Sequence, residues 1–198
     1  MQRHVNDPYV KRAQALGLRS RAAFKLLEID AKDRLFARGQ KVVDLGAAPG
    51  GWAQVVADKV GPEGRVVAVD LLEMGPIPGV TVISGDFTEE SVLREVERAI
   101  GAAKIDLVLS DMSPNLSGVA ASDQARSISL CALATEFALR HLKPSGALLL
   151  KAFQGAGFPE LLAEIRRRFD RVTVRKPSAS RSRSAETYIL ARGPREIS

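Results

Sequence analysis

At 198 residues the chain has the length of one domain, and its 45% hydrophobic and 26% charged residues are typical of a globular protein with a sizeable core. Apolar runs such as Ala147–Leu150 are far too short to cross a membrane, and Met1–Asp7 lacks the apolar segment of an export signal. A single cysteine, Cys131, excludes an internal disulfide, so we expect a cytoplasmic protein.

The expected elements of the first half of the chain follow a basic N-terminal arm. They are a helix from an N-cap at Ser20 to about Lys32, a strand at Lys41–Leu45, a helix at Trp52–Lys59, strands at Arg65–Val69 and Val80–Ser84, and a helix at Glu89–Ile100. The elements of the second half are a strand at Ile105–Ser110, a helix from about Ser122 to His141 that ends before Lys143-Pro144-Ser145-Gly146, a strand at Ala147–Lys151, a helix at Pro159–Phe169, and strands at Arg171–Arg175 and Glu186–Ala191.

This alternation predicts an α/β fold with a Rossmann-like, seven-stranded, mostly parallel sheet and helices on both faces. No helix separates the last two strands, so the last strand should run antiparallel. Ligands of such sheets bind beyond the carboxyl ends of the parallel strands, and functional residues are expected at that edge.

Charge is distributed unevenly along the chain. The net charge is +6 and the isoelectric point about 9.8, with basic residues at both ends and a mixed or acidic stretch at 58–97. The basic residues of the two ends are Lys11, Arg12, Arg19, Arg21, Lys25, Arg166, Arg167, Arg168, Arg171, Arg175, Lys176, Arg181 and Arg183. This distribution favours a polyanion such as nucleic acid as partner, although charge alone fits solvated faces equally well.

The segment Val42–Trp52 has the pattern of a strand, a glycine-rich turn and the start of a helix. Gly46 and Gly50 permit positive φ angles and a close approach of a ligand to the backbone. The spacing is not the G-x-G-x-x-G of dinucleotide sites, and Asp44 would repel a pyrophosphate but suits the cationic amino group of a methionine moiety. The turn indicates a cofactor site, while acidic residues in turns also occur for purely structural reasons.

Acidic residues also end the next two strands. Asp70 is placed to accept hydrogen bonds from ribose hydroxyls, and Asp86 from an adenine amino group, with Phe87 beside the adenine ring. Together with Asp44 they predict a pocket for a positively charged adenosine, that is, S-adenosyl-L-methionine.

Four charged residues fit a purely structural role poorly. Asp111 follows a buried strand, Lys151 closes another, and Glu186 opens the antiparallel strand at the same edge of the sheet. Lys25 lies among apolar residues of the first helix. Each of them alone is more often a surface charge, but topology brings three of them to the ligand edge.

Two lysines and two carboxylates around one point can orient and deprotonate a hydroxyl for in-line attack on a methyl sulfonium. Lys151 would either accept the proton as a neutral amine or orient the hydroxyl as an ammonium. Lys25 would lower the pKa of Lys151, whereas Asp111 and Glu186 would raise it, so the sequence leaves the direction of the shift open.

From about Val5 to Ala191 the sequence resembles the FtsJ-like family of ribosomal RNA ribose 2′-O-methyltransferases. The resemblance is carried by Arg19-Ser20-Arg21-Ala22-Ala23-Phe24-Lys25-Leu26, Asp44-Leu45-Gly46-Ala47-Ala48-Pro49-Gly50-Gly51-Trp52, Ser110-Asp111-Met112-Ser113-Pro114-Asn115, Lys151-Ala152-Phe153-Gln154-Gly155 and Arg181-Ser182-Arg183-Ser184-Ala185-Glu186-Thr187-Tyr188. The family's Lys-Asp-Lys-Glu tetrad would correspond to Lys25, Asp111, Lys151 and Glu186, with Lys151 as the catalytic base. Its cofactor residues would correspond to Gly50, Trp52, Asp70, Asp86 and Asp111.

The resemblance implies a class I methyltransferase domain over residues 1–198, with 1–18 as a basic arm and 19–192 as the catalytic fold. Within the family the chain is most similar to bacterial enzymes that methylate a uridine ribose in large-subunit (23S) ribosomal RNA, which implies an assembled or assembling large subunit as acceptor. Bacterial relatives often carry a longer basic tail than the residues before His4, and Ala23 replaces an aromatic residue common in relatives. Both departures would weaken RNA docking and leave the chemistry unchanged.

Candidate RNA contacts gather in two segments, the long connection Lys176–Ala185 and the N-terminal region. They are Lys11, Arg12, Arg19, Arg21, Arg181 and Arg183. With only 5% aromatic residues, docking should depend on shape and charge. We expect a monomer without DNA or membrane partners, and the Cys and His spacing predicts no metal site.

The sequence fits two other functions less well. A non-catalytic ribosome-assembly factor could keep the fold and bind RNA, but it has no need of Lys151 at a strand end. A nicotinamide-dependent oxidoreductase is disfavoured by the missing G-x-G-x-x-G.

Overall fold

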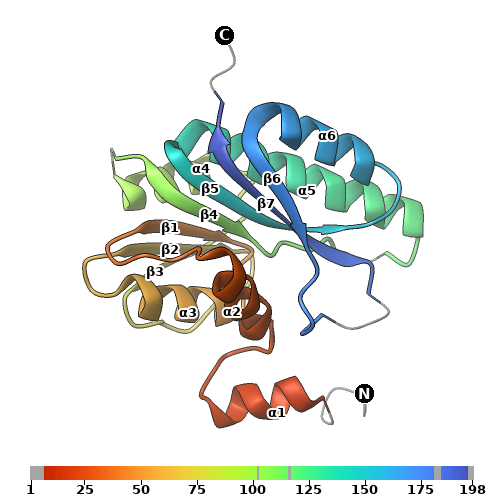
Figure 1. The fold of residues 1–198 in the computed structure, drawn as a ribbon. Coiled ribbons are helices and arrows are strands. Elements are labelled where there is room, and N and C mark those ends of the chain that lie inside the picture. The colour runs from red at the N-terminus through yellow and green to blue at the C-terminus, as the bar shows by residue number, and fades with distance from the viewer. Residues whose placement is uncertain (1–6, 102, 116, 181–183, 196–198) are drawn as a thin grey trace.

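The computed structural model describes residues 7–101, 103–115, 117–180 and 184–195. They form one seven-stranded sheet with helices packed on both faces (Figure 1). The helices are α1 (Pro8–Ala15), α2 (Ala22–Asp33), α3 (Gly51–Val60), α4 (Glu90–Ile100), α5 (Ala120–His141) and α6 (Phe158–Arg168). The strands are β1 (Lys41–Leu45), β2 (Arg65–Asp70), β3 (Val80–Ser84), β4 (Ile105–Ser110), β5 (Leu142–Phe153), β6 (Phe169–Arg175) and β7 (Glu186–Pro194).

The strand order is β3-β2-β1-β4-β5-β7-β6. Strands β1 to β5 pair in parallel, while β7 runs antiparallel between β5 and β6. The predicted fold class, including the antiparallel last strand, is confirmed. The order reverses between β1 and β4, and a crevice at such a switch point is where doubly wound sheets bind ligands.

Two apolar clusters hold the helices on the sheet. One lies under α4, α5 and α6 and includes Val96, Phe137 and Ile165; the other lies under α2 and α3 and includes Leu26 and Trp52. The apolar spacing of three and four residues along each helix places these side chains on one stripe, which faces the sheet. Central strands are therefore buried on both faces, as their nearly continuous apolar sequences indicate.

The start of α2 differs from the prediction. Arg21, not Ser20, occupies the N-cap, and no side chain caps the helix. The Ser20 hydroxyl instead lies against the start of α3, where a Cβ on Gly51 would come within 2.4 Å of it. Ser20 thus packs one helix against another and its side chain does not satisfy the N–H groups of α2.

Helix α1 lies within the segment 1–18, for which the sequence predicted a basic arm and no helix. Asp7 caps it by accepting a hydrogen bond from the Tyr9 N–H at 3.0 Å, and Pro8 occupies its first position. Within the described ranges, no helix combines the length and hydropathy needed to cross a membrane.

Candidate functional site

The turn after β1 depends on two glycines. Gly46 has a φ of +73°, and a Cβ there would lie 2.8 Å from the Cα of Met112, which follows β4. Gly50 caps α3 with a φ of +99°, and a Cβ there would lie 2.5 Å from Ile77 Cδ1. Neither position accepts a side chain, so the turn stays close to β4 and its backbone remains free for a ligand.

Asp44, at the penultimate position of β1, is fully buried. Neither carboxylate oxygen has a hydrogen-bond partner among the described residues. Burial, followed by the negative charges of Asp111 and Asp70, raises the pKa of Asp44 well above its usual value. The buried side chain therefore lies just inside the ligand edge of the sheet. A positive charge on a ligand nearby would stabilise its ionised form.

The next two strand-end acids are more accessible. Asp70 accepts hydrogen bonds from the Ala48 N–H and the Leu72 N–H, each at 2.9 Å, and so ties the glycine turn to the end of β2. Asp86 accepts from the N–H and hydroxyl of Thr88, which lower the pKa of its carboxyl group. Both carboxylates keep acceptor capacity for a further ligand group.

The two aromatic residues assigned to the cofactor are largely inside the protein. Trp52 is 2% exposed, and its indole N–H donates to the Ala22 carbonyl at 2.9 Å. Phe87 packs edge-to-face on Phe137, with ring centroids 5.2 Å apart. The Trp52 ring thus supports the helix behind the turn, and the assignment of either ring to a cofactor stays a prediction.

Lys151 and Asp111 form the first charged pair at the edge. The Lys151 ammonium donates to the Asp111 carbonyl at 2.6 Å and lies 3.1 Å from its Oδ1 atom. Lys151 is only 8% exposed, which is unusual for a lysine. Parallel pairing of β4 and β5 brings the two residues together, because each follows the apolar part of its strand.

Lys25 and Glu186 form the second pair. Their charged groups approach to 2.7 Å, and the Ser180 hydroxyl donates to the same carboxylate at 2.9 Å. Burial raises the pKa of Glu186, but the Lys25 and Ser180 hydrogen bonds and the positive charge of Lys151 outweigh it, so the net shift is downward. Glu186 is therefore ionised at neutral pH.

Tyr188 links the two pairs and was missed by the sequence analysis. It lies opposite Lys151 across the β5–β7 ladder, and its hydroxyl donates to Asp111 Oδ1 at 3.2 Å. Lys25 Nζ lies 5.9 Å from the centre of its ring. Period-two alternation from Glu186 places Tyr188 on the same face, and this signal was available in the sequence.

The structure gives the predicted RNA contacts different surroundings. The Arg19 guanidinium donates to the Gly75 carbonyl at 2.9 Å and to the Pro76 carbonyl at 2.5 Å, which anchors the segment after β2. Arg21 pairs with Asp7 and donates to the Ala179 carbonyl at 2.5 Å. Lys11 and Arg12 are exposed on α1, whereas Arg181 and Arg183 lie outside the described residues.

All four tetrad residues therefore meet at the edge that also carries the glycine turn. Two cations, two carboxylates and a buried phenol can hold a hydroxyl group and accept its proton. In the part of the chain that the structure describes, no cluster of three or more His, Cys, Asp or Glu side chains is placed to hold a metal ion.

Comparison with known proteins identifies the family of the chain. Residues 18–194 match the family described as FtsJ-like methyltransferase. The chain is 59% identical over 190 residues to "Ribosomal RNA large subunit methyltransferase E" of Azoarcus sp. (strain BH72), covering 96% of this chain and 93% of that protein. The protein of the same name from Thiobacillus denitrificans is 56% identical over 194 residues, covering 98% and 88%.

Solved structures show the same fold. A Plasmodium falciparum protein assigned as a ribosomal RNA methyltransferase superposes with a TM-score of 0.76 at 26% identity, covering 89% of this chain and 98% of that one. A Clostridium thermocellum protein assigned as an rRNA methylase, 16% identical, superposes with a TM-score of 0.59 over 85% of this chain and 97% of that one. The family match spans all seven strands and the whole tetrad, and the chain belongs to the FtsJ-like methyltransferase family.

Proposed function

We propose that this chain transfers a methyl group from S-adenosyl-L-methionine to the ribose 2′-hydroxyl of a uridine in large-subunit ribosomal RNA. The assembled or assembling large subunit, met in the cytoplasm, is the acceptor. The observation that carries the proposal is the convergence of the pairs Lys151–Asp111 and Lys25–Glu186 beside the glycine turn. The names of the bacterial relatives support a ribosomal acceptor.

The residues at the turn fit the cofactor. S-adenosyl-L-methionine, when bound, supplies an electrophilic methyl group on a positively charged sulfur. The residues assigned to hold it are Asp44, Gly46, Gly50, Trp52, Asp70, Asp86, Phe87 and Asp111. The fit rests on two positions that exclude a Cβ, on the unpartnered carboxylate of Asp44, and on the acceptor capacity of Asp70 and Asp86.

The chain's own groups prepare the acceptor hydroxyl. Lys151 Nζ acts as the catalytic base toward the 2′-hydroxyl, and Asp111 fixes the position of Nζ through its carbonyl and carboxylate. The Tyr188 hydroxyl stays protonated, because burial and then the charges of Asp111 and Glu186 raise its pKa, and it donates to Asp111. The ion pair of Lys25 with Glu186 completes the cluster.

The test is transfer of labelled methyl groups to large subunits from cells that lack this methylation, followed by nucleoside analysis. Lys151→Ala should lower the turnover rate by at least about 100-fold, as expected for loss of a proton acceptor. Lys143→Ala is the matched control. Lys143 lies on the same strand and pairs with Asp106 of β4 at 2.7 Å, but at the opposite edge of the sheet. The Lys143→Ala variant should retain the wild-type turnover rate.

Three outcomes would contradict the proposal. A folded wild-type protein that binds large subunits without transferring label would be a non-catalytic assembly factor. Label on a base instead of a ribose would refute the role of the tetrad. Equal loss of activity in Lys151→Ala and Lys143→Ala would mean that lysine–aspartate pairs between β4 and β5 matter for the fold alone.

A further inference from the structure

A basic surface away from the catalytic cluster lies on the face of β6 and β7 that meets the last turn of α2. It is a cavity of about 360 Å³, here called the basic groove, lined mainly by Lys32, Asp33, Arg171, Thr173, Arg175 and Arg192. A smaller hollow of about 120 Å³ shares Lys32 and Arg175 with it and reaches Lys176 and Pro177. The basic groove therefore continues toward the β6–β7 connection, which begins at the active edge.

The acidic groups of this surface are already engaged. The Arg175 guanidinium donates to both carboxylate oxygens of Asp33, at 2.8 and 2.6 Å, and Arg192 donates to the Asp33 carbonyl at 2.8 Å. Glu28, in the smaller hollow, accepts from the Ser178 N–H and hydroxyl. Four cations and one paired carboxylate leave the basic groove with an excess of positive charge, and two of its arginines are held in place.

The remaining two cations are not bound to a single acid, although the charge of Lys32 helps to lower the pKa of the nearby Glu28 and Asp33 carboxyl groups. No ion pair of Lys32 or Arg171 occurs within the ranges that the structure describes. Arg171 also lies directly opposite Arg192 across the β6–β7 ladder. Like charges at opposed positions destabilise a sheet, and an anion bound between them would remove that cost.

We propose that the basic groove binds the phosphate backbone of ribosomal RNA and extends the docking surface from the active edge along α2 and β6. This inference rests on the proposed function, since it deepens the recognition of the same acceptor. From Arg171 to Arg175 the strand spans about 13 Å, a length that suits a run of phosphates better than a single small anion. Arginines fixed by Asp33 bind phosphate with little loss of side-chain entropy.

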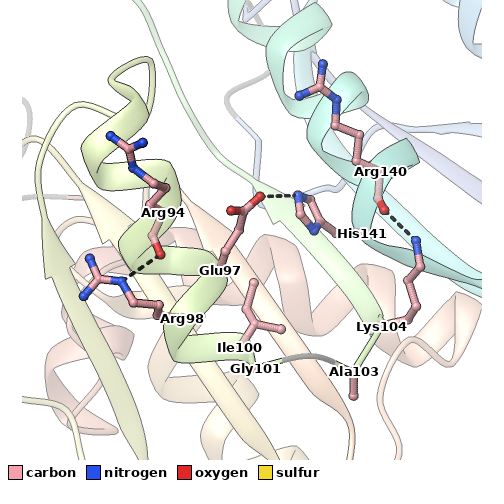
Figure 2. Close-up of a pocket in the computed structure, with 9 residues that line it drawn as sticks. All are labelled: Arg94, Glu97, Arg98, Ile100, Gly101, Ala103, Lys104, Arg140 and His141. Atoms are coloured by element: carbon pink, nitrogen blue, oxygen red, sulfur yellow. Dashed lines mark hydrogen bonds and ion pairs between the residues drawn. The ribbon is translucent and has the colours of Figure 1, made fainter.

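Another pocket, of about 560 Å³, also carries positive charge, but its charged groups have a different arrangement. It lies between the ends of α4 and α5 at the opposite edge of the sheet (Figure 2). Two of its cations donate to helix carbonyls, Arg98 to the Arg94 carbonyl and Lys104 to the Arg140 carbonyl. The His141 imidazole, whose pKa is lowered by burial, lies 3.3 Å from a Glu97 carboxylate oxygen. These contacts compensate the negative ends of two helices.

The experiment measures binding of undermethylated large subunits and of protein-free large-subunit RNA at several salt concentrations. The double variant Lys32→Gln/Arg171→Gln should weaken both affinities roughly tenfold and reduce the salt slope by about 1.4–1.8 for two lost phosphate contacts. Lys32→Arg/Arg171→Lys, which keeps the charges, should bind like wild type. Arg94→Gln/Arg98→Gln removes two arginines from the pocket of Figure 2 and is the matched control.

The outcomes separate this inference from the proposed function. If Lys32→Gln/Arg171→Gln binds RNA with wild-type affinity, or if the control variant loses as much affinity, the basic groove does not bind RNA. This conclusion holds even if the wild-type protein transfers methyl groups. Loss of affinity for subunits but not for protein-free RNA identifies an acidic ribosomal protein as the partner and also overturns the inference. If the double variant binds both subunits and protein-free RNA more weakly, but the wild-type protein transfers no methyl group, the basic groove is supported as an RNA-binding surface. That result refutes only the enzymatic function.

Discussion

Asp44 differs from the other strand-end carboxylates because both of its oxygens are buried without a hydrogen-bond partner among the described residues. An isolated buried carboxylate favours its neutral form, which explains why its pKa is raised. The unfolded chain loses this proton near the ordinary Asp pKa, whereas the folded chain retains it to higher pH. Ligand-free protein therefore loses stability as the pH rises through that interval.

Replacing Asp44 by Asn should consequently stabilise the ligand-free protein at neutral pH. The gain in unfolding free energy over wild type should grow by up to about 1.4 kcal/mol per pH unit above pH 4 and vanish below it. Denaturant titrations at several pH values measure this difference. Asp58→Asn, an exposed change on α3, is the control and should show no such trend. A pH-independent loss of stability in Asp44→Asn would contradict the assignment.

At the scale of elements, α1 is attached to the rest of the protein by a small set of contacts. Asp7 both caps α1 and pairs with Arg21, which in turn binds the Ala179 carbonyl of the β6–β7 connection. Tyr9 packs on Phe24 of α2 with ring centroids 5.7 Å apart. The helix thus joins the N-terminal segment to a loop beside the tetrad.

Asp7→Ala should release α1 without unfolding the sheet. Loss of the cap and of the half-buried ion pair should cost about 1–3 kcal/mol, so hydrogen exchange of the α1 amides should accelerate roughly 5- to 150-fold while the amides of β4 are unchanged. Asp7→Asn keeps a good cap but removes the charge, and it should fall between wild type and Asp7→Ala. Equal protection of α1 in all three proteins would show that Asp7 does not hold the helix.

The sequence predicted the strands and most helices because each is apolar at the period of its own structure. The sequence-based prediction failed where an element was short or where a side chain's role depends on tertiary contacts. The Asp7-Pro8 pair marks the start of α1, but this helix has only eight residues, Pro8–Ala15, and a single one of them, Ala13, is buried. Ser20 has the composition of an N-cap, yet its side chain is recruited by the close approach of α3, which local sequence does not encode.

For the whole molecule, the prediction of the site followed from one rule of topology. Residues at the ends of parallel strands meet at one edge, so Asp111 and Lys151 were expected together, and the reversal of order at β1 and β4 places the glycine turn beside them. This topological rule predicts where a residue lies in the sheet, but not which groups its side chain contacts. The engagement of Arg19 with loop carbonyls and the burial of Trp52 required the packed structure.

The packing beneath Lys151 has a further consequence. Cys131, the only cysteine of the chain, is buried on α5, and its thiol donates to the Lys151 carbonyl at 3.2 Å. Burial raises the pKa of the thiol to about 12, so the native protein contains almost no reactive thiolate at neutral pH. A thiol reagent can therefore alkylate Cys131 only when α5 separates from β5.

The reactivity of Cys131 therefore reports how often α5 separates from β5, the strand that bears the proposed catalytic lysine. Under native conditions a thiol reagent should modify Cys131 at a rate set by the opening equilibrium, and saturating S-adenosyl-L-methionine should slow it by the factor 1 + [L]/Kd. Cys131→Ala/Ser129→Cys, with its thiol at an exposed position of the same helix, provides the unprotected rate. If wild type reacted as fast as this variant, α5 would not shield the strand that bears Lys151.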